Sequence, residues 1–317
     1  MSSPLQVSGP AQLVAAVPYL IGFEPSNSVV AVFMRDSRVI LTVRVDASSE
    51  VSQAVERAAL ACGADELAVL TYDTDETINL PGDLIVRDVI AVRGGRWRSL
   101  MCQDRTCCPP EGNWISQECR DAVAAAFVLD GVVPLPSRAA LEESFRSLED
   151  EHFAQRVALA IEDAVVMLGA APSIDALRRW REDAADDIEH TVVDCLNDPA
   201  AQARCVVGLQ DIRVRDVVLH RMADLVELRN IGEWLRGVAV VTPAEYAAAV
   251  YTLCAAAFWQ SGDGARACLA LEHACDLDPD YSLATLLFRA IQAGMPPATW
   301  RQALRDTSEE ECLRGAA

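Results

Sequence analysis

The chain has 317 residues, of which 51% are hydrophobic and 23% are charged, a composition typical of a folded protein and not of a disordered one. This length accommodates two domains of roughly 100–200 residues each. The formal net charge is −20 at pH 7, and because phosphate binding needs clustered positive charge, the composition predicts no direct binding of nucleic acid.

The first 23 residues carry no feature of a targeting segment. They lack a basic stretch, and Pro10 and Pro18 interrupt their apolar run, so they predict neither a signal peptide nor a membrane span. We therefore expect a cytoplasmic protein without membrane contact, in which most of the 11 cysteines are reduced. Six cysteines stand in apolar, helix-like contexts and are expected to pack as small hydrophobic side chains: Cys62, Cys195, Cys205, Cys254, Cys268 and Cys275.

The first part of the chain, residues 1–115, predicts an α+β domain built on a mixed β-sheet. Residues 28–34 and 39–45 are rich in β-branched side chains and flank a polar turn, which is the pattern of a β-hairpin. Residues 50–62 have the apolar spacing of a helix, and Gly63 is expected to end it.

Further strands complete the predicted sheet. Residues 66–72 predict one strand by their apolar, β-branched composition. Residues 84–92 and 96–101 predict a second hairpin around Gly94 and Gly95, because a two-residue turn requires the positive φ that glycine adopts without strain. Strands with an intervening helix and short links predict a sheet domain with one or two helices.

Residues 93–114, which close this domain, have the most unusual composition in the chain, RGGRWRSLMCQDRTCCPPEGNW. Cys102, Cys107 and Cys108 fall within seven positions, and Cys119 follows eleven residues later. Four thiols are enough for a structural zinc site, although the paired CxxC spacing typical of such sites is missing. Zinc, a disulfide and packed free thiols therefore stay open as alternatives.

The same segment holds the highest concentration of basic side chains in this acidic chain. Arginine forks bind carboxylates or phosphates, and tryptophan offers a face for stacking. The cluster is therefore a candidate pocket for an anionic ligand or a nucleotide, and the alternative is a set of salt bridges to acidic side chains of the chain itself. The chain contains neither a Walker loop nor a G-x-G-x-x-G motif to support classical nucleotide binding. The candidate residues are Arg93, Arg96, Trp97, Arg98 and Arg105.

No catalytic residue is predicted. A cysteine nucleophile needs a base nearby, and the four histidines, His152, His190, His220 and His273, all stand in predicted helices without a pairing motif. The sequence therefore favours a protein that is not an enzyme.

From residue 116 to residue 317 the pattern predicts helix almost throughout. Ser137 and Ser173 are predicted N-caps. The carboxylates and arginines of residues 178–189 predict a solvated helix face and not an acidic metal site. Helical spacing covers residues 117–129, 137–149, 151–169, 173–196, 200–209, 212–222 and 224–236.

Two helices near the C-terminus follow the spacing of a tetratricopeptide repeat. The small residues Ala255 and Ala267 let two antiparallel helices approach closely, and Phe258 and Leu271 fill the space between them. A Gly-Asp-Gly turn separates the two helices. Because one repeat cannot bury its own apolar faces, the pair is expected to stack on the preceding helices and on a following helix at residues 282–293.

Four segments carry a resemblance to a known family: PYLIGFEPSNSVVAV, GGRWRSLMCQDRTCCPPEG, the RVRD at residues 213–216, and AFWQSGDGARACLALEHACDLDPDYSLATLLFRAIQAGMPP. On these segments the chain resembles an actinobacterial family catalogued as domain of unknown function 4192. The cysteine-containing segment is the most specific of the four. The resemblance implies no catalytic residues, because the activity of the family is not established.

The chain departs from the family pattern in one link. In the family that this chain resembles, a longer stretch, expected to be a helix, joins the strands that match residues 67–72 and 84–92. Here the link has only about ten residues, whereas a parallel crossover needs a dozen or more. The short link therefore predicts a different strand pairing or a missing layer, as in a shortened relative that is either carried by a phage or divergent.

Three hypotheses for the function follow. Stacked helix pairs present a groove that receives peptides or helices, and negative charge attracts a basic partner. This favours a non-enzymatic adaptor or inhibitor that binds another protein over a purely structural helical layer. The second hypothesis is an enzyme or ligand sensor that uses residues 93–114. The third treats the acidic surface as a mimic of DNA and requires carboxylates arrayed on one face.

Overall fold

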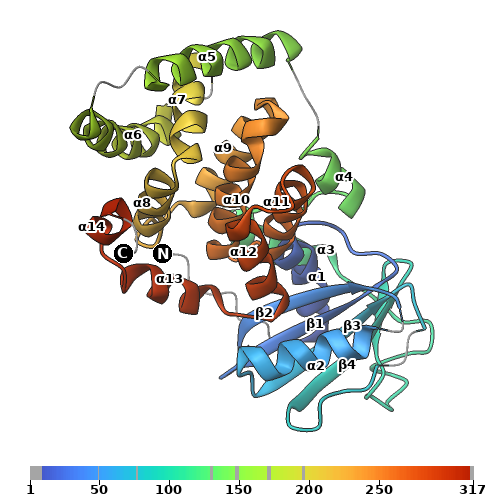
Figure 1. Cartoon of the computed structure of the whole chain (residues 1–317). Coiled ribbons are helices and arrows are strands. Elements are labelled where there is room, and N and C mark those ends of the chain that lie inside the picture. Colours follow the sequence, from blue (N-terminus) through green and yellow to red (C-terminus); the bar gives the residue numbers. More distant parts are fainter. Residues whose placement is uncertain are drawn as a thin grey trace. The chain divides into compact units, whose positions relative to one another are not determined.

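The computed structural model describes residues 9–48, 50–75, 78–128, 131–146, 150–169, 173–194 and 197–314. The chain divides into two compact units, which are described separately (Figure 1). Unit 1 consists of Met1–Leu141 with Gln292–Pro296, and unit 2 consists of Glu142–Ile291 with Pro297–Ala317. Cys195, one of the cysteines predicted to pack in a helix, lies outside the described residues.

Unit 1 is built on a six-stranded mixed sheet. Its strands are β1 (Ser28–Arg35), β2 (Arg38–Asp46), β3 (Glu66–Tyr72), β4 (Ile85–Arg93), β5 (Arg96–Ser99) and β6 (Asn113–Trp114). They lie in the order β2-β1-β3-β4-β5-β6. Strands β3 and β4 are parallel, and the other neighbouring pairs are antiparallel. The mixed sheet and both hairpins, β1–β2 and β4–β5, are therefore confirmed.

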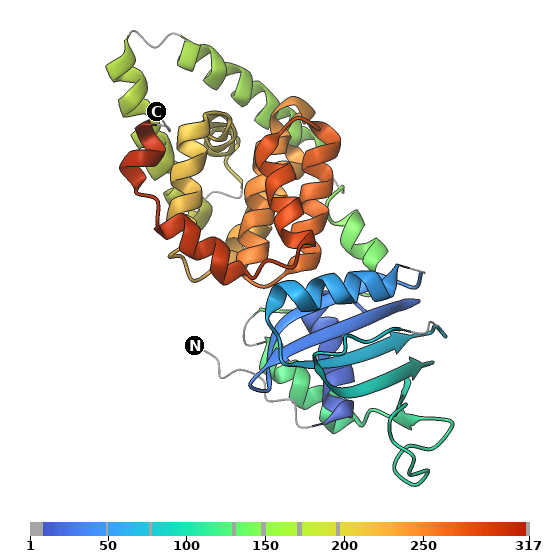
Figure 2. The same cartoon turned by 60° about the horizontal axis from the view of Figure 1, so that its bottom comes forward.

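Helix α2 (Val51–Cys62) covers one face of this sheet (Figure 2). Its Val55 belongs to a buried cluster with Phe33 of β1 and Leu67 of β3, and none of the three exposes any surface. Gly63 ends the helix with φ of 62°, in the left-handed region that glycine adopts without steric cost. The predicted helix and its glycine stop are both confirmed.

Two helices cover the opposite face of the sheet (Figure 2). They are α1 (Pro10–Ile21) and α3 (Gln117–Val128), which pack on each other. The rings of Tyr19 and Phe127 stack between them with a centroid distance of 4.9 Å. The sequence predicts α3 but not α1, and the sheet has helices on both of its faces.

The connection from β3 to β4 resolves the strand pairing that the short link left open. The two strands are parallel, with Glu66 opposite Ile85, so the alternative of a different pairing is wrong. The described residues between Tyr72 and Ile85 form no helix. Instead, Ile78 and Leu80 of the link pack against the core beside α2. The crossover therefore lacks a helical layer, as the other alternative predicted.

Unit 1 extends past the predicted boundary near residue 115. The backbone N–H of Glu24 donates to the carbonyl oxygen of Leu135 at 2.9 Å. The backbone N–H of Leu135 donates to the carbonyl oxygen of Gly22, also at 2.9 Å. These bonds tie the chain that follows α3 back to the end of α1. The compact unit therefore continues to Leu141.

The described secondary structure of unit 2 is helical. Its helices are α5 (Glu151–Gly169), α6 (Ile174–Asp194), α7 (Pro199–Gln210), α8 (Ile212–Met222), α9 (Leu228–Val241), α10 (Ala244–Gln260), α11 (Gly264–Leu277), α12 (Ser282–Gln292), α13 (Pro297–Arg305) and α14 (Glu309–Arg314), and the short α4 (Arg138–Glu143) spans the division between units. The hydroxyls of Ser137 and Ser173 accept backbone N–H groups at 3.1 and 3.2 Å, which confirms both predicted N-caps. Among the described helices, none combines the length and apolar content that crossing a membrane requires.

Helix α10 is the core of unit 2. Every residue from Ala247 to Gln260 is buried, as expected of a helix with neighbours on all sides. Helices α9, α11 and α7 pack against it. Ala255, Phe258 and Leu271, which were predicted to lie between two packed helices, are fully buried. The assignment of α10 and α11 to the tetratricopeptide class stays a prediction.

Candidate functional site

The cysteine loop, residues 100–112, joins β5 to β6 in unit 1. Ser99 at the end of β5 fixes its start. The Ser99 hydroxyl donates to Oδ1 of Asp88 at 2.6 Å and accepts the backbone N–H groups of Met101 and Cys102 at 3.2 and 3.1 Å. Because Asp88 belongs to β4, these bonds anchor the loop to the sheet.

A tight turn at Asp104 reverses the direction of the loop. The carboxylate of Asp104 accepts the hydroxyl and the backbone N–H of Thr106 at 2.7 and 2.8 Å, and these hydrogen bonds hold the pKa of Asp104 below its ordinary value. The Asp104 carbonyl accepts the N–H of Cys108 at 2.8 Å. Asn113 of β6 donates through Nδ2 to the carbonyl oxygen of Cys107 at 2.8 Å. The turn thus brings the two adjacent cysteines back to the first cysteine of the loop.

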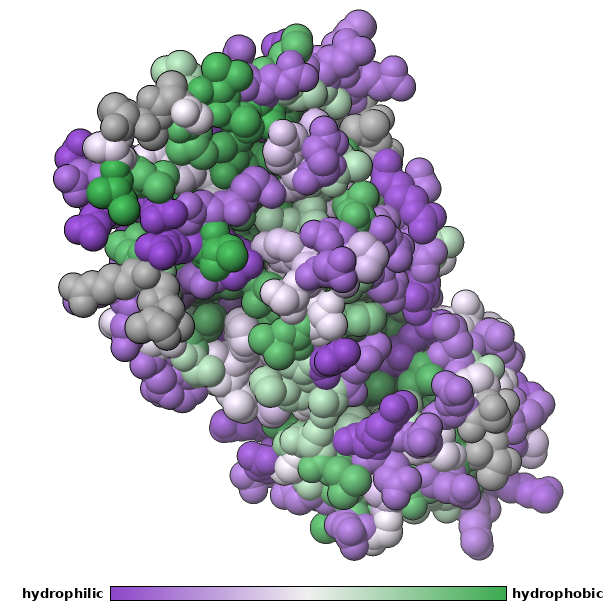
Figure 3. All heavy atoms as spheres, in the orientation of Figure 1, coloured by the Kyte–Doolittle hydropathy of each residue, from purple (hydrophilic) through white to green (hydrophobic). Residues whose placement is uncertain are grey.

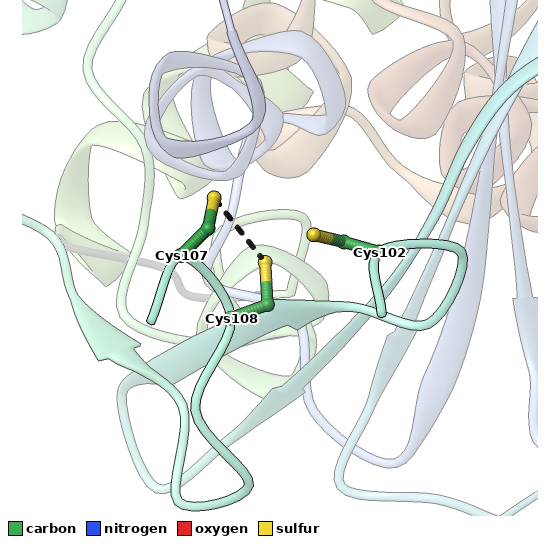
Figure 4. A group of neighbouring side chains, drawn as sticks. All are labelled: Cys102, Cys107 and Cys108. Carbon is green, nitrogen blue, oxygen red and sulfur yellow. Dashed lines mark hydrogen bonds between the residues drawn. The ribbon is translucent and has the colours of Figure 1, made fainter. Parts of the chain in front are cut away.

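Three thiols meet inside this loop (Figure 4). The Sγ atoms of Cys102, Cys107 and Cys108 all lie within 4.8 Å of one another, and those of Cys107 and Cys108 are 4.0 Å apart. Cys108 is buried, Cys102 is half-buried and Cys107 is exposed, so the cluster is open to solvent on one side. Cys119 lies on α3 and is not part of this group, although the sequence placed it among the four candidate ligands.

The neighbouring thiols raise the pKa of Cys107 to about 11. The largest contribution is its hydrogen bond with Cys108, followed by the charge of Cys108 and by the corresponding interactions with Cys102. Negative charge on one sulfur disfavours ionisation of the next. Cys107 is therefore a protonated thiol at neutral pH and a weak nucleophile, despite its exposure.

Removing the two neighbouring sulfurs is expected to make Cys107 more reactive. In the Cys102→Ala/Cys108→Ala double variant its pKa falls toward the ordinary 9.0, which raises the thiolate fraction at pH 8 about hundredfold. A more acidic thiol is also intrinsically less nucleophilic, with a Brønsted coefficient of about 0.4–0.5. We therefore expect iodoacetamide to alkylate Cys107 about tenfold faster at pH 8 in the presence of EDTA. Mass spectrometry of the peptide that contains Cys107 measures this rate, and an unchanged rate would contradict the electrostatic explanation.

The arginines predicted to form an anion site do not share one face of the sheet with Trp97. Side chains alternate along a strand, so Arg96 and Arg98 lie on one face of β5 and Trp97 lies on the other. Arg93 forms an ion pair with an aspartate of the β3–β4 link, and Arg105 is exposed in the cysteine loop. A single ligand therefore cannot contact Trp97 and both arginines of β5 from the same face.

Arg96 supports the end of the cysteine loop. Its guanidinium carbon lies 4.4 Å from the ring centroid of Trp114, and Nη1 donates to the carbonyl oxygen of Gly112 at 3.2 Å. Gly112 has φ of 76°, and a Cβ atom there would lie 3.1 Å from the carbonyl oxygen of Trp97, so a larger residue would be strained. Arg96 thus contacts an aromatic ring and a carbonyl oxygen, whereas the sequence predicts for it an anionic ligand, a nucleotide or a salt bridge to an acidic side chain.

The cysteine loop has no imidazole base within its own unit. All four histidines of the chain belong to unit 2. His273 stacks against Tyr251 and Phe145 with centroid distances of 5.2 and 6.0 Å, and burial lowers its pKa. Nδ1 of His220 lies 3.0 Å from the carbonyl oxygen of Leu304. Both rings thus take part in the packing of the helical unit.

A cleft of about 320 Å³ opens in unit 2 where α5, α6 and α7 meet. Helix α7 packs against both α5 and α6. The apolar lining comes from all three helices, with Ala164 of α5, Trp180 and Ala184 of α6, and Val207 of α7. Figure 3 shows hydrophobic side chains gathered on the surface in this part of unit 2.

The charged groups that line this cleft are not balanced. Arg204 forms an ion pair with Asp187 at 2.6 Å, whereas Asp183 has no ion-pair partner among the described residues. Trp180, Asp183, Ala184 and Asp187 follow the spacing i, i+3, i+4, i+7, which places them on one face of α6. The charge pattern of residues 178–189 predicts a solvated face for these aspartates, and the tryptophan at the same spacing is the signal that could have indicated the cleft.

Exposed apolar side chains accompany the cleft. On α5, Leu159, Val166 and Met167 are 62%, 71% and 75% exposed, and Ile174 at the start of α6 is 80% exposed. Met167 lies one turn after Ala164 on the same side of α5, so it borders the cleft. Single exposed apolar residues are ordinary on protein surfaces, but one that borders an apolar cleft enlarges the surface available to a bound partner.

Comparison with known protein families shows where this chain belongs. The model of the family described as domain of unknown function (DUF4192) matches residues 10–298, which include both the cysteine loop and the α5–α6–α7 cleft. No curated protein and no solved structure matches the chain. Since the family model covers most of the sequence, this chain belongs to the DUF4192 family.

Proposed function

We propose that this protein is a non-enzymatic binding protein, and that its α5–α6–α7 cleft receives a basic amphipathic helix of another protein. The observation that carries the proposal is the cleft itself, which combines an apolar lining with a carboxylate that has no ion-pair partner among the described residues. Grooves of this kind take up the apolar face of a helix through side chains spaced at i, i+3, i+4 and i+7.

The apolar part of the cleft supports a helix as the bound element. Trp180 and Val207 offer apolar surface inside the cleft, and the exposed Met167, on the same side of α5 as Ala164, extends this surface. A helix that places two or three apolar side chains in the cleft would also cover Met167. Burial stabilises a complex by about 25 cal/mol for each Å² of apolar surface removed from water.

The charge of the cleft supports a basic partner. Arg204 is compensated by Asp187, so the charge of Asp183 is available to an arginine or lysine at the edge of a bound helix. The net charge of −20 also accelerates the approach of a positively charged protein. A small organic cation could use the ring of Trp180 and the same carboxylate, but it would leave Met167 exposed.

A designed peptide tests this proposal. The probe is a fluorescein-labelled peptide of about 20 residues, about 30 Å long as a helix, with leucines on one face and arginines on the other. Its control is a scrambled peptide with the same composition and charge but no continuous apolar face. In titrations of the full chain followed by fluorescence anisotropy, we expect the amphipathic peptide to bind at least about tenfold more tightly than the control. Equal affinities would contradict the proposal.

Two charge reversals on α6 locate the binding site. Asp183→Arg changes a residue of the cleft lining and is expected to weaken binding of the amphipathic peptide about tenfold, which corresponds to about 1.4 kcal/mol. Glu182→Arg makes the same change of charge at the neighbouring exposed residue, outside the lining, and is expected to weaken binding less than about threefold, since salt screens charges outside the contact. Equal losses in both variants would indicate general attraction to an acidic chain instead of a specific cleft.

A further inference from the structure

We propose that Cys102, Cys107 and Cys108 bind one Zn²⁺ ion as thiolates and leave its fourth coordination position open to water or to a ligand from outside the loop. This site lies in unit 1 and is independent of the helix-binding cleft of unit 2. The proposal rests on the convergence of the three Sγ atoms within 4.8 Å of one another (Figure 4).

The separations of the sulfur atoms fit a tetrahedral zinc site. Zinc–sulfur bonds are about 2.3 Å long, which places two sulfur ligands of one tetrahedral ion about 3.8 Å apart. The sulfurs of Cys107 and Cys108 are 4.0 Å apart. Cys102 comes from the other side of the turn, and its sulfur lies within 4.8 Å of both. A side-chain adjustment of about 1 Å therefore closes the three sulfurs around one ion.

The loop holds its two adjacent cysteines in an unusual arrangement. In extended chain, neighbouring side chains point in opposite directions, and two such cysteines could not share one ion. Here the Cys108 N–H is bound to the carbonyl oxygen of Asp104, and the Cys107 carbonyl is bound by Asn113. These bonds curve the backbone so that both sulfurs lie on the side of Cys102. Such prior organisation of ligands favours metal binding.

The chemistry of the ligands favours zinc. Thiolates are preferred ligands of Zn²⁺, and a divalent cation removes the repulsion among three neighbouring thiolates. Zinc binds the deprotonated form of cysteine, so the affinity is expected to rise with pH. The exposure of Cys107 leaves the fourth position accessible, as in zinc sites that keep one position for an exchangeable ligand.

The experiment uses the full chain, reduced with a phosphine and stripped of metal with a chelator. Zn²⁺ is titrated in competition with a chromophoric chelator, and bound zinc is counted by elemental analysis after desalting. We expect one zinc per chain. Substitution of Co²⁺ for Zn²⁺ is expected to produce the absorption of a thiolate-coordinated tetrahedral ion. A chain that retains no stoichiometric metal, or metal without this thiolate absorption, would overturn the proposal.

Single variants identify the ligands. Cys102→Ser, Cys107→Ser and Cys108→Ser are each expected to weaken zinc binding more than about hundredfold, because loss of a ligand exceeds the ten- to hundredfold effect of changes around a site. Cys119→Ser is the matched control and is expected to retain the affinity of the unchanged chain. Equal losses from Cys119→Ser and the loop variants would overturn the three-thiolate assignment. Mass spectrometry of the unreduced protein tests for a disulfide instead. A loop peptide that is lighter by two hydrogens, in protein without bound zinc, would assign these thiols to a disulfide and overturn the proposal.

Discussion

Phe258→Ala is expected to lower the free energy of unfolding of unit 2 by about 3–5 kcal/mol, the range for truncation of a buried aromatic ring. The Phe258 side chain is completely buried in α10. Its ring lies 6.4 Å from that of Phe145, and the guanidinium of Arg266 lies 5.8 Å from its centroid. Helix α9 approaches so closely that a Cβ atom on Gly232 would lie 2.8 Å from the ring. Urea unfolding followed by tryptophan fluorescence measures the change.

A second substitution at the same contact makes this prediction specific. Gly232→Ala alone is expected to destabilise the unit by about 1–3 kcal/mol, because the added methyl group overlaps the ring of Phe258. In the Phe258→Ala background the same methyl group enters the vacated space, and alanine also favours a helix over glycine by about 1 kcal/mol. The second substitution should therefore be neutral or stabilising there. Additive losses of stability from the two substitutions would contradict the close packing of α9 on α10. Leu286→Ala is the control, because it truncates a side chain on α12 that is 58% exposed. A large loss there would indicate that any truncation destabilises unit 2.

Asp263→Ala is expected to destabilise the helical unit by about 3–5 kcal/mol, the range for removing one partner of a buried ion pair. The Asp263 side chain is 3% exposed. Its Oδ2 accepts hydrogen bonds from Arg266 at 2.6 Å and from Arg229 at 2.9 Å. Its Oδ1 accepts the backbone N–H of Arg266 at 3.1 Å and so caps α11. The alanine variant therefore loses the cap and leaves the buried Arg266 without this partner.

Asp263→Asn separates the two roles of this residue. Asparagine can still cap a helix through its side-chain oxygen, but it removes the negative charge that compensates the two guanidinium groups. We expect an intermediate loss of stability, measured by the same urea titration. A loss below about 1 kcal/mol in Asp263→Ala would show that Glu233, which lies 3.1 Å from Arg266, compensates the buried charge without help from Asp263.

Local chemistry made the strands of unit 1 predictable. Gly94 and Gly95 both have positive φ, at 53° and 77°, and they turn the β4–β5 hairpin as their sequence indicates. Helix α1 was missed because Pro10 and Pro18 argue against a helix. Pro10 occupies the first turn, where no backbone N–H is needed. The burial of Val17 and its apolar neighbours outweighs the hydrogen bond that Pro18 removes.

The pairing of β3 with β4 illustrates what the sequence leaves undetermined. The link between Tyr72 and Ile85 has twelve residues, which just reaches the length that a parallel crossover needs, and Ile78 and Leu80 of the link pack against the core beside α2. This packing involves residues distant in sequence, which periodicity does not report. The structural consequence of the short link therefore required the fold.

The same distinction applies to the candidate sites. The short spacing of Cys102, Cys107 and Cys108 indicated that they are neighbours, but the direction of the two adjacent side chains depends on the turn at Asp104. Cys119 lies on α3, outside the group, because helix packing and not sequence distance fixes its position. The α5–α6–α7 cleft was not predicted at all, since its lining combines residues from three helices.

Hydrogen–deuterium exchange of the full chain, with and without the amphipathic peptide, tests most directly whether the cleft is the binding surface. We expect slower exchange in α5, α6 and α7, the three helices that line the cleft, and no comparable change with the scrambled peptide. Protection confined to other helices, with exchange of α5, α6 and α7 unchanged at saturating peptide, would contradict it.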